Sequence, residues 1–363
     1  MKVRFLNLSV QEKSRKKELM RAVDKVLSHG QIVLGPEVRQ FEGRIARFCG
    51  VTYAVGVNSG SDALYFALRA LGIGPGDQVI TSCLSFVATA NAISMTGAQP
   101  VFVDIRDDFN IDPQKIIKAI NPRTKAIVPV HFTGKMCAMK AIMSIARQYK
   151  LKVVEDAAQA FGASISAKKA GSWGHVSALS MNPMKVLAAC GEAGAVISND
   201  VHIKKTVEAL RYNGAPSVID AHYVSLNGRL DTIQAAILLE RLKHFNKDIQ
   251  RRRRAARYYS QALHDMVIVP SEQKGEVHVY YTYNIHCSKR DQLKRFLTAK
   301  GIETKVHHPL LMPEQKAYKG QVKGQWPMAR KIVSSSLCLP ISEKVTKKEQ
   351  DYVIDCIRKF YKH

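Results

Sequence analysis

The feature that most constrains this sequence is a repeated alternation of short β-branched runs with longer segments of helical periodicity, beginning at Tyr53. Helical patterns, for example at residues 62–71 and 139–149, lie between the strand-like runs. The strand-like runs are residues 53–57, 78–81, 100–103, 126–130 and 152–155. This alternation predicts an α/β fold with a mostly parallel sheet that helices cover on both faces. Ligands of such sheets bind beyond the carboxyl ends of the strands, so we expect the chemistry in the loops that follow these runs.

The last third of the chain has a different pattern. A long helix-like stretch at 232–264 leads into strands around 277–286 and helices near 292–300 and 347–361. We therefore predict a large domain over residues 1–250, which includes the N-terminal segment, and a smaller α+β domain over residues 251–363. A length of 363 residues with 46% hydrophobic residues is sufficient for two such units.

Several protein classes are disfavoured by composition. The sequence has no apolar stretch of about 18 residues and no secretion signal, so we predict a cytoplasmic protein without a membrane partner. Its seven cysteines are scattered and never spaced as CxxC, which predicts reduced thiols and no metal site. Cys190 follows Lys185 closely; we expect it to pack in the core, although a reactive role stays open.

The formal net charge of +25 is the most unusual bulk property. The basic clusters at 13–17, 251–254 and 344–348 lie in segments of helical spacing, where solvated helix faces explain them. The positive field still attracts anions such as nucleotide diphosphates. Because no zinc-finger or aromatic RNA-binding pattern is present, we predict no nucleic-acid partner.

The loop after the first predicted strand has the composition of an anion site. Small residues, including Gly60 and Ser61, follow Asn58 and open the next helix. Backbone amides at a helix N-terminus can bind a phosphate. An ordinary capped helix, with Ser59 and Asp62 close to a capping box, is the alternative.

An acidic pair, Glu155 and Asp156, ends the predicted strand at 152–155. A charge there is costly unless it has a partner, so Asp156 requires a cation or strong donors. A protonated pyridine nitrogen is one such cation, and Gln159 could reach the phenolic oxygen of the same ring. A salt bridge to lysine or arginine is the alternative.

Lys185 lies in an apolar run, five residues after Ser180 and shortly before the glycine-rich segment 191–194. Burial among Met, Ala, Leu and Val would lower the pKa of this lysine and give the nucleophilic amine that Schiff-base chemistry needs. A lysine that extends from the edge of the core to solvent is the alternative.

Taken together, these segments resemble the DegT/DnrJ/StrS family of sugar aminotransferases, which are pyridoxal-phosphate enzymes of fold type I. The resemblance runs along nearly the whole chain. It depends on residues 30–36, 41–42, 59–61, 86–91, 155–159, 180–185, 191–194, 228–231, 234–236 and 337–340.

The resemblance implies a role for each matching residue. Lys185 would form a Schiff base with the cofactor and then move a proton between the substrate carbon and the cofactor carbon. Asp156 would hold the pyridine nitrogen, Gln159 would bind the ring hydroxyl, and Phe86 would stack on the ring.

The phosphate of the cofactor would be bound by Gly60, Ser61 and Ser180. Asn227 would reach the phosphate in the neighbouring subunit, so the resemblance also implies a homodimer with shared active sites. A turn residue before Gly228 is the alternative for Asn227.

The substrate side departs from the family pattern. Residues 306–313 resemble a His-Tyr-Pro motif followed by Pro-Leu-His, but His308 replaces the tyrosine and Pro313 the second histidine. In relatives this region shapes the sugar pocket. The candidate substrate residues are His131, Glu192, Arg229, His307 and His308, and a structural role for His131 is equally open.

These residues predict a ping-pong transaminase. An amino acid, expected to be glutamate, would convert pyridoxal phosphate to pyridoxamine phosphate, and a nucleotide-linked 3- or 4-keto sugar would accept the nitrogen, in cell-surface polysaccharide biosynthesis. Within the family, a cyclitol aminotransferase or a pyridoxamine-dependent sugar dehydratase is the alternative. Such dehydratases are expected to have histidine in place of Lys185. A regulatory or binding protein that keeps the fold without turnover is the alternative from another class.

Overall fold

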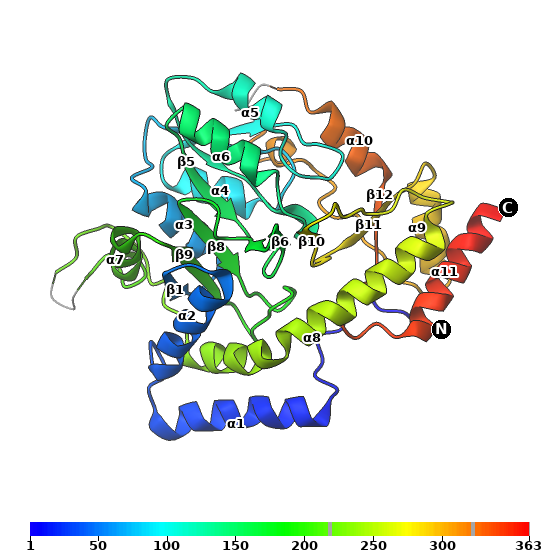
Figure 1. The fold of residues 1–363 in the computed structure, drawn as a ribbon, viewed down its shortest axis with the longest axis horizontal. Coiled ribbons are helices and arrows are strands. Elements are labelled where there is room, and N and C mark those ends of the chain that lie inside the picture. The colour runs from blue at the N-terminus through cyan, green and yellow to red at the C-terminus, as the bar shows by residue number, and fades with distance from the viewer. Residues whose placement is uncertain (217–219, 321–323, 363) are drawn as a thin grey trace.

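The computed structural model describes residues 1–216, 220–320 and 324–362. A seven-stranded sheet lies at its centre, in the order β1-β9-β8-β5-β4-β2-β3 (Figure 1). The strands are β1 (Tyr53–Val57), β2 (Gln78–Ser82), β3 (Gln99–Val103), β4 (Thr124–Val128), β5 (Lys152–Asp156), β8 (Val176–Ser180) and β9 (Gly194–Ser198). Strand β9 is antiparallel to both its neighbours, and the pairs from β8 to β3 are parallel. The α/β prediction is confirmed.

Helices cover both faces of this sheet, because successive side chains of a strand point to opposite sides. In β5, Val153 belongs to one hydrophobic cluster and Val154 to the other. Helices α2 (Pro36–Cys49), α5 (Pro113–Ala119) and α6 (Met139–Gln148) pack in the first cluster, and α3 (Gly60–Ala70), α4 (Ala88–Met95) and α7 (Val201–Leu210) in the second. Burial on both faces explains why the strands read as continuous apolar runs.

The longest helix, α8 (Thr232–Leu263), extends from the sheet region to the C-terminal part of the molecule (Figure 1). It packs against α1 (Lys13–His29), α2 and α11 (Lys347–Lys362). Its residue Phe245 lies in a cluster with the sheet, whereas Tyr259 lies in a C-terminal cluster. The predicted boundary near residue 250 therefore falls inside an unbroken helix.

The C-terminal cluster is built on a two-stranded sheet. Strand β11 (Tyr283–His286) pairs antiparallel with β12 (Ser336–Leu339), and α9 (Arg290–Ala299) and α11 pack against them. Val3 is buried in the same cluster and pairs with Ile302. By contrast, α10 (Pro327–Ser335) buries Ala329 in a cluster with Cys83, at the end of β2. The division into two domains at residue 250 remains a proposal. Val3 packs with the C-terminal part and Ala329 packs with the sheet part, so neither predicted domain is built from one continuous range alone.

The remaining elements are short. They are β6 (Ser164–Ile165), β7 (Lys168–Lys169) and β10 (Glu276–Val277), which form a three-stranded sheet, and the 3-10 helices η1 (Phe132–Gly134) and η2 (Met312–Glu314). Within the described ranges, no helix is both long and apolar enough to cross a membrane.

Candidate active site

The loop between β1 and α3 forms a tightly packed cradle. Ser59 is the N-cap of α3, and its hydroxyl accepts a hydrogen bond from the Asp62 amide at 3.1 Å. A Cβ atom on Gly60 would lie 2.5 Å from Cβ of Ser180, and one on Gly194 would lie 2.4 Å from the Ser59 carbonyl oxygen. Glycine at these two positions lets the ends of β1 and β8 and the start of β9 meet. The first backbone amides of α3 thus lie beside the Ser180 side chain, an arrangement that suits a phosphate.

Asp156 ends β5 and is buried, with 3% of its surface exposed. Its carboxylate accepts hydrogen bonds from the Thr89 hydroxyl at 2.8 Å and from the Ala158 amide at 3.2 Å. Burial raises the pKa of this carboxyl, and the two hydrogen bonds and the charge of Lys185 oppose that rise. A cation above Asp156 would offset the cost of burial.

Gln159 is held with its amide in a defined orientation. Its Oε1 accepts a hydrogen bond from the backbone amide of Thr133 at 3.0 Å, and 4% of its surface is exposed. Thr133 has the unusual φ of 60°, which aims this amide at Gln159. With the oxygen engaged, the Nε2 group is the part that can donate to a ligand.

Lys185 begins from a turn that is fixed by Asn182. The Asn182 side chain accepts from the Met184 amide at 3.0 Å and donates to Glu192 at 2.6 Å. Burial of the amino group lowers the pKa of Lys185 to about 8, whereas the charges of Asp156 and Glu192 act to raise it. A substantial share of this lysine is therefore a neutral amine near physiological pH.

His131 lies in the interior of the protein. Its side chain is fully buried, and its Nε2 lies 2.9 Å from Glu155. Its Nδ1 accepts from the Cys137 amide at 3.2 Å, so Nε2 is the protonated nitrogen that donates to Glu155. Both ring nitrogens thus have partners inside the protein. Of the two interpretations left open by the sequence, these contacts favour the structural one, and a role of His131 at the substrate stays a prediction.

Three aromatic side chains, those of Phe86, His307 and His308, pack together near the predicted cofactor residues. The Phe86 ring is 56% exposed, and its centroid lies 5.9 Å from that of His308. His308 and His307 pack at 4.1 Å, and burial lowers the pKa of His308 to about 4. Burial also lowers the pKa of His307, whose two ring nitrogens have no hydrogen-bond partner among the described residues. Both rings are therefore neutral near pH 7, and His307 retains an unused donor and acceptor.

Asn227 and Arg229 lie at the surface and contact each other. The Arg229 Nε donates to Asn227 Oδ1 at 2.8 Å, and its guanidinium lies over the Tyr212 ring at 4.9 Å. The carbonyl of Gly228 accepts from the Asn58 amide at 2.8 Å, which places the segment beside the cradle. Apart from this contact with each other, neither side chain hydrogen-bonds a predicted cofactor residue within the described chain. Their roles in a shared site stay predictions.

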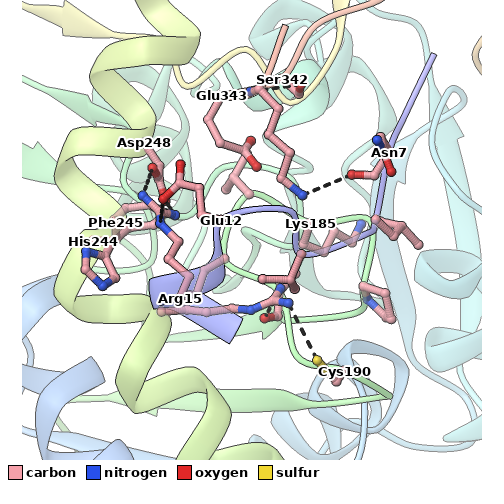
Figure 2. Close-up of a pocket in the computed structure, with 18 of the residues that line it drawn as sticks. Asn7, Glu12, Arg15, Lys185, Cys190, His244, Phe245, Asp248, Ser342 and Glu343 are labelled. Atoms are coloured by element: carbon pink, nitrogen blue, oxygen red, sulfur yellow. Dashed lines mark hydrogen bonds and ion pairs between the residues drawn. The ribbon is translucent and has the colours of Figure 1, made fainter. Parts of the chain in front are cut away.

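A cavity of about 570 Å³ lies beside the lysine (Figure 2). It is bordered by α1, α8, residues 183–190 and the N-terminal segment. Arg15 binds both carboxylate oxygens of Asp248 there, at 2.7 and 2.8 Å. Of the predicted cofactor residues, Lys185 alone is among the described lining residues.

Cys190 also lines the cavity, and it is exposed, unlike the other six cysteines. The expectation that it packs in the core was wrong. Its Sγ lies 3.5 Å from Nη2 of Arg241, and its amide donates to the Gln234 side chain. The segment after Lys185 leaves the core here and runs along the surface of α8.

The arrangement fits pyridoxal phosphate on three counts. Gly60, Ser180 and the start of α3 offer a phosphate cradle. Asp156 is a buried carboxylate that would be stabilised by a ring cation. Lys185 is a partly buried amine whose pKa is lowered by desolvation. A salt bridge to lysine or arginine, the alternative considered for Asp156, is absent among the described residues, and Lys185 likewise has no described ion-pair partner.

Two residues of the site were missed by sequence reasoning. Thr89 lies in the motif at 86–91, but its hydrogen bond to Asp156 depends on how α4 meets β5. Tyr281, whose ring lies under the Lys185 amino group, comes from the C-terminal segment. No local pattern around Tyr281 signals this contact.

Comparisons with known proteins agree over nearly the whole length. The model of the DegT/DnrJ/EryC1/StrS aminotransferase family matches residues 13–358. The pleiotropic regulatory protein of Geobacillus stearothermophilus is 40% identical over 370 residues, with 100% of both proteins covered. The UDP-2-acetamido-2-deoxy-3-oxo-D-glucuronate aminotransferase of Pseudomonas aeruginosa is 37% identical, with 93% of this chain and 95% of the relative covered. The structure of S. venezuelae DesV in complex with a ketimine intermediate matches with a TM-score of 0.96 at 36% identity, covering 100% of this chain and 99% of that one.

Proposed function

The chain belongs to the DegT/DnrJ/EryC1/StrS aminotransferase family, and we propose that it transfers an amino group from an amino acid to the keto group of a nucleotide-linked sugar. Aminotransferases of this family depend on pyridoxal phosphate. The observation that most supports the proposal is the position of a partly buried amine of lowered pKa, Lys185, near a buried carboxylate, Asp156, beside an anion cradle. Glutamate is the expected donor.

The side chains divide the chemistry among them. Lys185 is the nucleophile and the group that moves protons, because its lowered pKa leaves both protonation states accessible. Asp156 orients and stabilises the ring nitrogen, and Gln159 donates to the ring oxygen. When bound, pyridoxal phosphate supplies the electron sink for the reaction. Phe86 offers its exposed face to the ring, and Gly60, Ser61 and Ser180 bind the phosphate.

The substrate is a nucleotide sugar with a ketone at C3, the position that the name of the P. aeruginosa relative prints. The net charge of +25 favours a dianionic diphosphate. Glu192, Arg229, His307 and His308 are the proposed substrate residues. The neutral His307 ring has two nitrogens without a partner among the described residues, and these can hydrogen-bond sugar hydroxyls.

The assembly and the location are part of the same proposal. We infer a homodimer in which Asn227 reaches the phosphate of the neighbouring site, and a cytoplasmic location. The surface position of Asn227 beside the cradle supports the first inference. Mixing an Asn227→Ala chain with a Lys185→Ala chain tests it, because a shared site would restore activity in one of the two sites of a mixed dimer.

The activity is tested by incubating the protein with pyridoxal phosphate, glutamate and a panel of UDP- and dTDP-linked 3-keto and 4-keto sugars. Mass spectrometry should detect a sugar in which oxygen has been replaced by an amino group, and the Lys185→Ala variant should give none. An absorbance spectrum taken before and after glutamate tests the first half-reaction alone. If no visible cofactor band forms in the parent protein, the role of Lys185 is refuted.

A regulatory function is the second candidate, because the 40% identical relative from G. stearothermophilus has a regulatory name. Lys185 is present and partly buried, and Asp156 is present and buried, which supports turnover. A protein that binds the cofactor, reacts with no amino acid and aminates no sugar would favour regulation.

A further inference from the structure

Tyr281 makes a direct contact with the catalytic lysine of the proposed reaction. The Nζ atom of Lys185 lies 4.7 Å from the centroid of the Tyr281 ring, over its face. This distance is within the range of about 6 Å in which a cation is attracted to an aromatic ring. Among the described residues, the amino group makes no hydrogen bond or ion pair. The ring face is therefore its immediate partner.

The turn that carries Tyr281 is held rigidly. Tyr280 has a left-handed φ of 49°, a costly conformation for an aromatic residue. The His278 ring stacks on Tyr280 at 4.0 Å, and its Nδ1 accepts from the Tyr280 amide at 2.8 Å. Arg252 donates to the Tyr280 carbonyl at 3.2 Å. A Cβ on Gly134 would lie 2.8 Å from the Tyr281 nitrogen, so the loop at 132–134 also confines this turn.

Charged groups surround the amine at longer range. Asp156 on β5 and Glu192 favour its charged form, whereas burial disfavours it. Burial and the charge of Lys185 lower the pKa values of His307 and His308, so both rings are neutral. The Tyr281 hydroxyl keeps its proton, because burial raises its pKa to about 12. Tyr281 thus acts through a neutral ring face and not as an anion.

We propose that Tyr281 is a positioning residue whose ring face stabilises the Lys185 amino group in its charged form whenever that group is not bonded to the cofactor. The inference rests on the proposed role of Lys185. The neutral amine is the nucleophile, and the ammonium is the form that can return a proton to the substrate carbon. Tyr281 sets the balance between these two forms.

The test measures how Lys185 titrates, without turnover. Protein freed of cofactor is mixed with pyridoxal phosphate over a series of pH values, and the rate at which the visible band appears is recorded. The midpoint of the rate against pH reports the pKa of Lys185. Tyr281→Leu removes the ring and should lower the midpoint by about one pH unit. Tyr281→Phe keeps the ring face and should leave the midpoint unchanged.

Fluorinated phenylalanines at position 281 provide a series that preserves ring shape. Each added fluorine weakens the negative ring face and should lower the midpoint further, so the test holds even if the leucine variant does not fold. Unchanged midpoints in this series would overturn the inference, as would a shift in Tyr281→Phe as large as in Tyr281→Leu. Absence of the visible band in the parent protein would instead refute the proposed function itself.

Discussion

Thr89 offers the sharpest test of how the site keeps Asp156 ionised. The Thr89 hydroxyl has one proton and donates it to the Asp156 carboxylate at 2.8 Å. Ser85 lies 3.3 Å from the same hydroxyl oxygen and must therefore be the donor in that second contact. The Thr89→Val substitution removes the donor with almost no change in shape. Because Thr89 and Asp156 are 2% and 3% exposed, water cannot replace the lost bond.

The size of the effect follows from the charge of the acceptor. A hydrogen bond to a charged group contributes about 1.5–3 kcal/mol. Its loss in Thr89→Val raises the pKa of Asp156 by about one to two units, since one unit corresponds to about 1.4 kcal/mol. At a pH below the Asp156 pKa values of parent and variant, ionising Asp156 costs more free energy in the variant. The affinity of the variant for the cofactor therefore falls by about tenfold to a hundredfold. Above both pKa values the carboxylate is ionised in either protein and the affinities converge.

Calorimetric titration with pyridoxamine phosphate measures this affinity without Schiff-base formation by Lys185. Thr89→Ser keeps the hydroxyl and should match the parent, and Ser85→Ala should show a smaller loss in the same direction as Thr89→Val. Equal affinities of Thr89→Val and the parent at every pH would refute the reasoning. An equal loss at every pH would point to damaged packing and would contradict the role of ionisation.

Three further outcomes are expected. Gly60→Ala places a Cβ 2.5 Å from that of Ser180 and should weaken the binding of pyridoxamine phosphate by about tenfold. Pyridoxamine, which lacks the phosphate, serves as the control ligand. Equal losses of affinity for both ligands would contradict the phosphate cradle. Glu155→Gln should lower the free energy of unfolding in urea by about 3 kcal/mol, because the Glu155 carboxylate accepts hydrogen bonds from three backbone amides and a buried imidazole. An unchanged urea midpoint would show that the negative charge of Glu155 is not needed for stability. Glu192→Gln should lower the midpoint pH for formation of the visible band by about half a unit, because the charge of Glu192 raises the pKa of Lys185; a midpoint at or above that of the parent would exclude this influence.

Much of the sheet could be predicted from sequence because buried strands and amphipathic helices have different hydrophobic periods. Each of the five strand-like runs overlaps a strand of the structure, and the end of β5 placed Asp156 correctly at the edge where ligands bind. The reversed direction of β9 could not be predicted. A short apolar run such as Gly194–Ser198 is buried equally well in either direction, and its pairing depends on residues far away in the chain.

The residues that sequence reasoning misplaced or missed depend on contacts between distant segments. His131 follows a strand and is near the site, but its ring is turned to Glu155, whose partners are backbone amides at 171–174. Cys190 was expected inside because cysteine is usually buried, yet it follows the turn after Lys185 out to the surface. Tyr281 reaches the lysine only because the C-terminal segment folds back over the end of the sheet.

The 32-residue helix α8 limits how the molecule can move. At about 1.5 Å per residue it is close to 50 Å long, and it contributes Phe245 to the core of the sheet and Tyr259 to the C-terminal core. The N-terminal chain makes a second link, because Val3 pairs with Ile302 while α1 packs along α8. Closure of the two parts around a sugar would have to bend a continuous helix and shift this second link at the same time. We therefore expect a preformed site, with substrate entry and product release through local movements of loops and side chains.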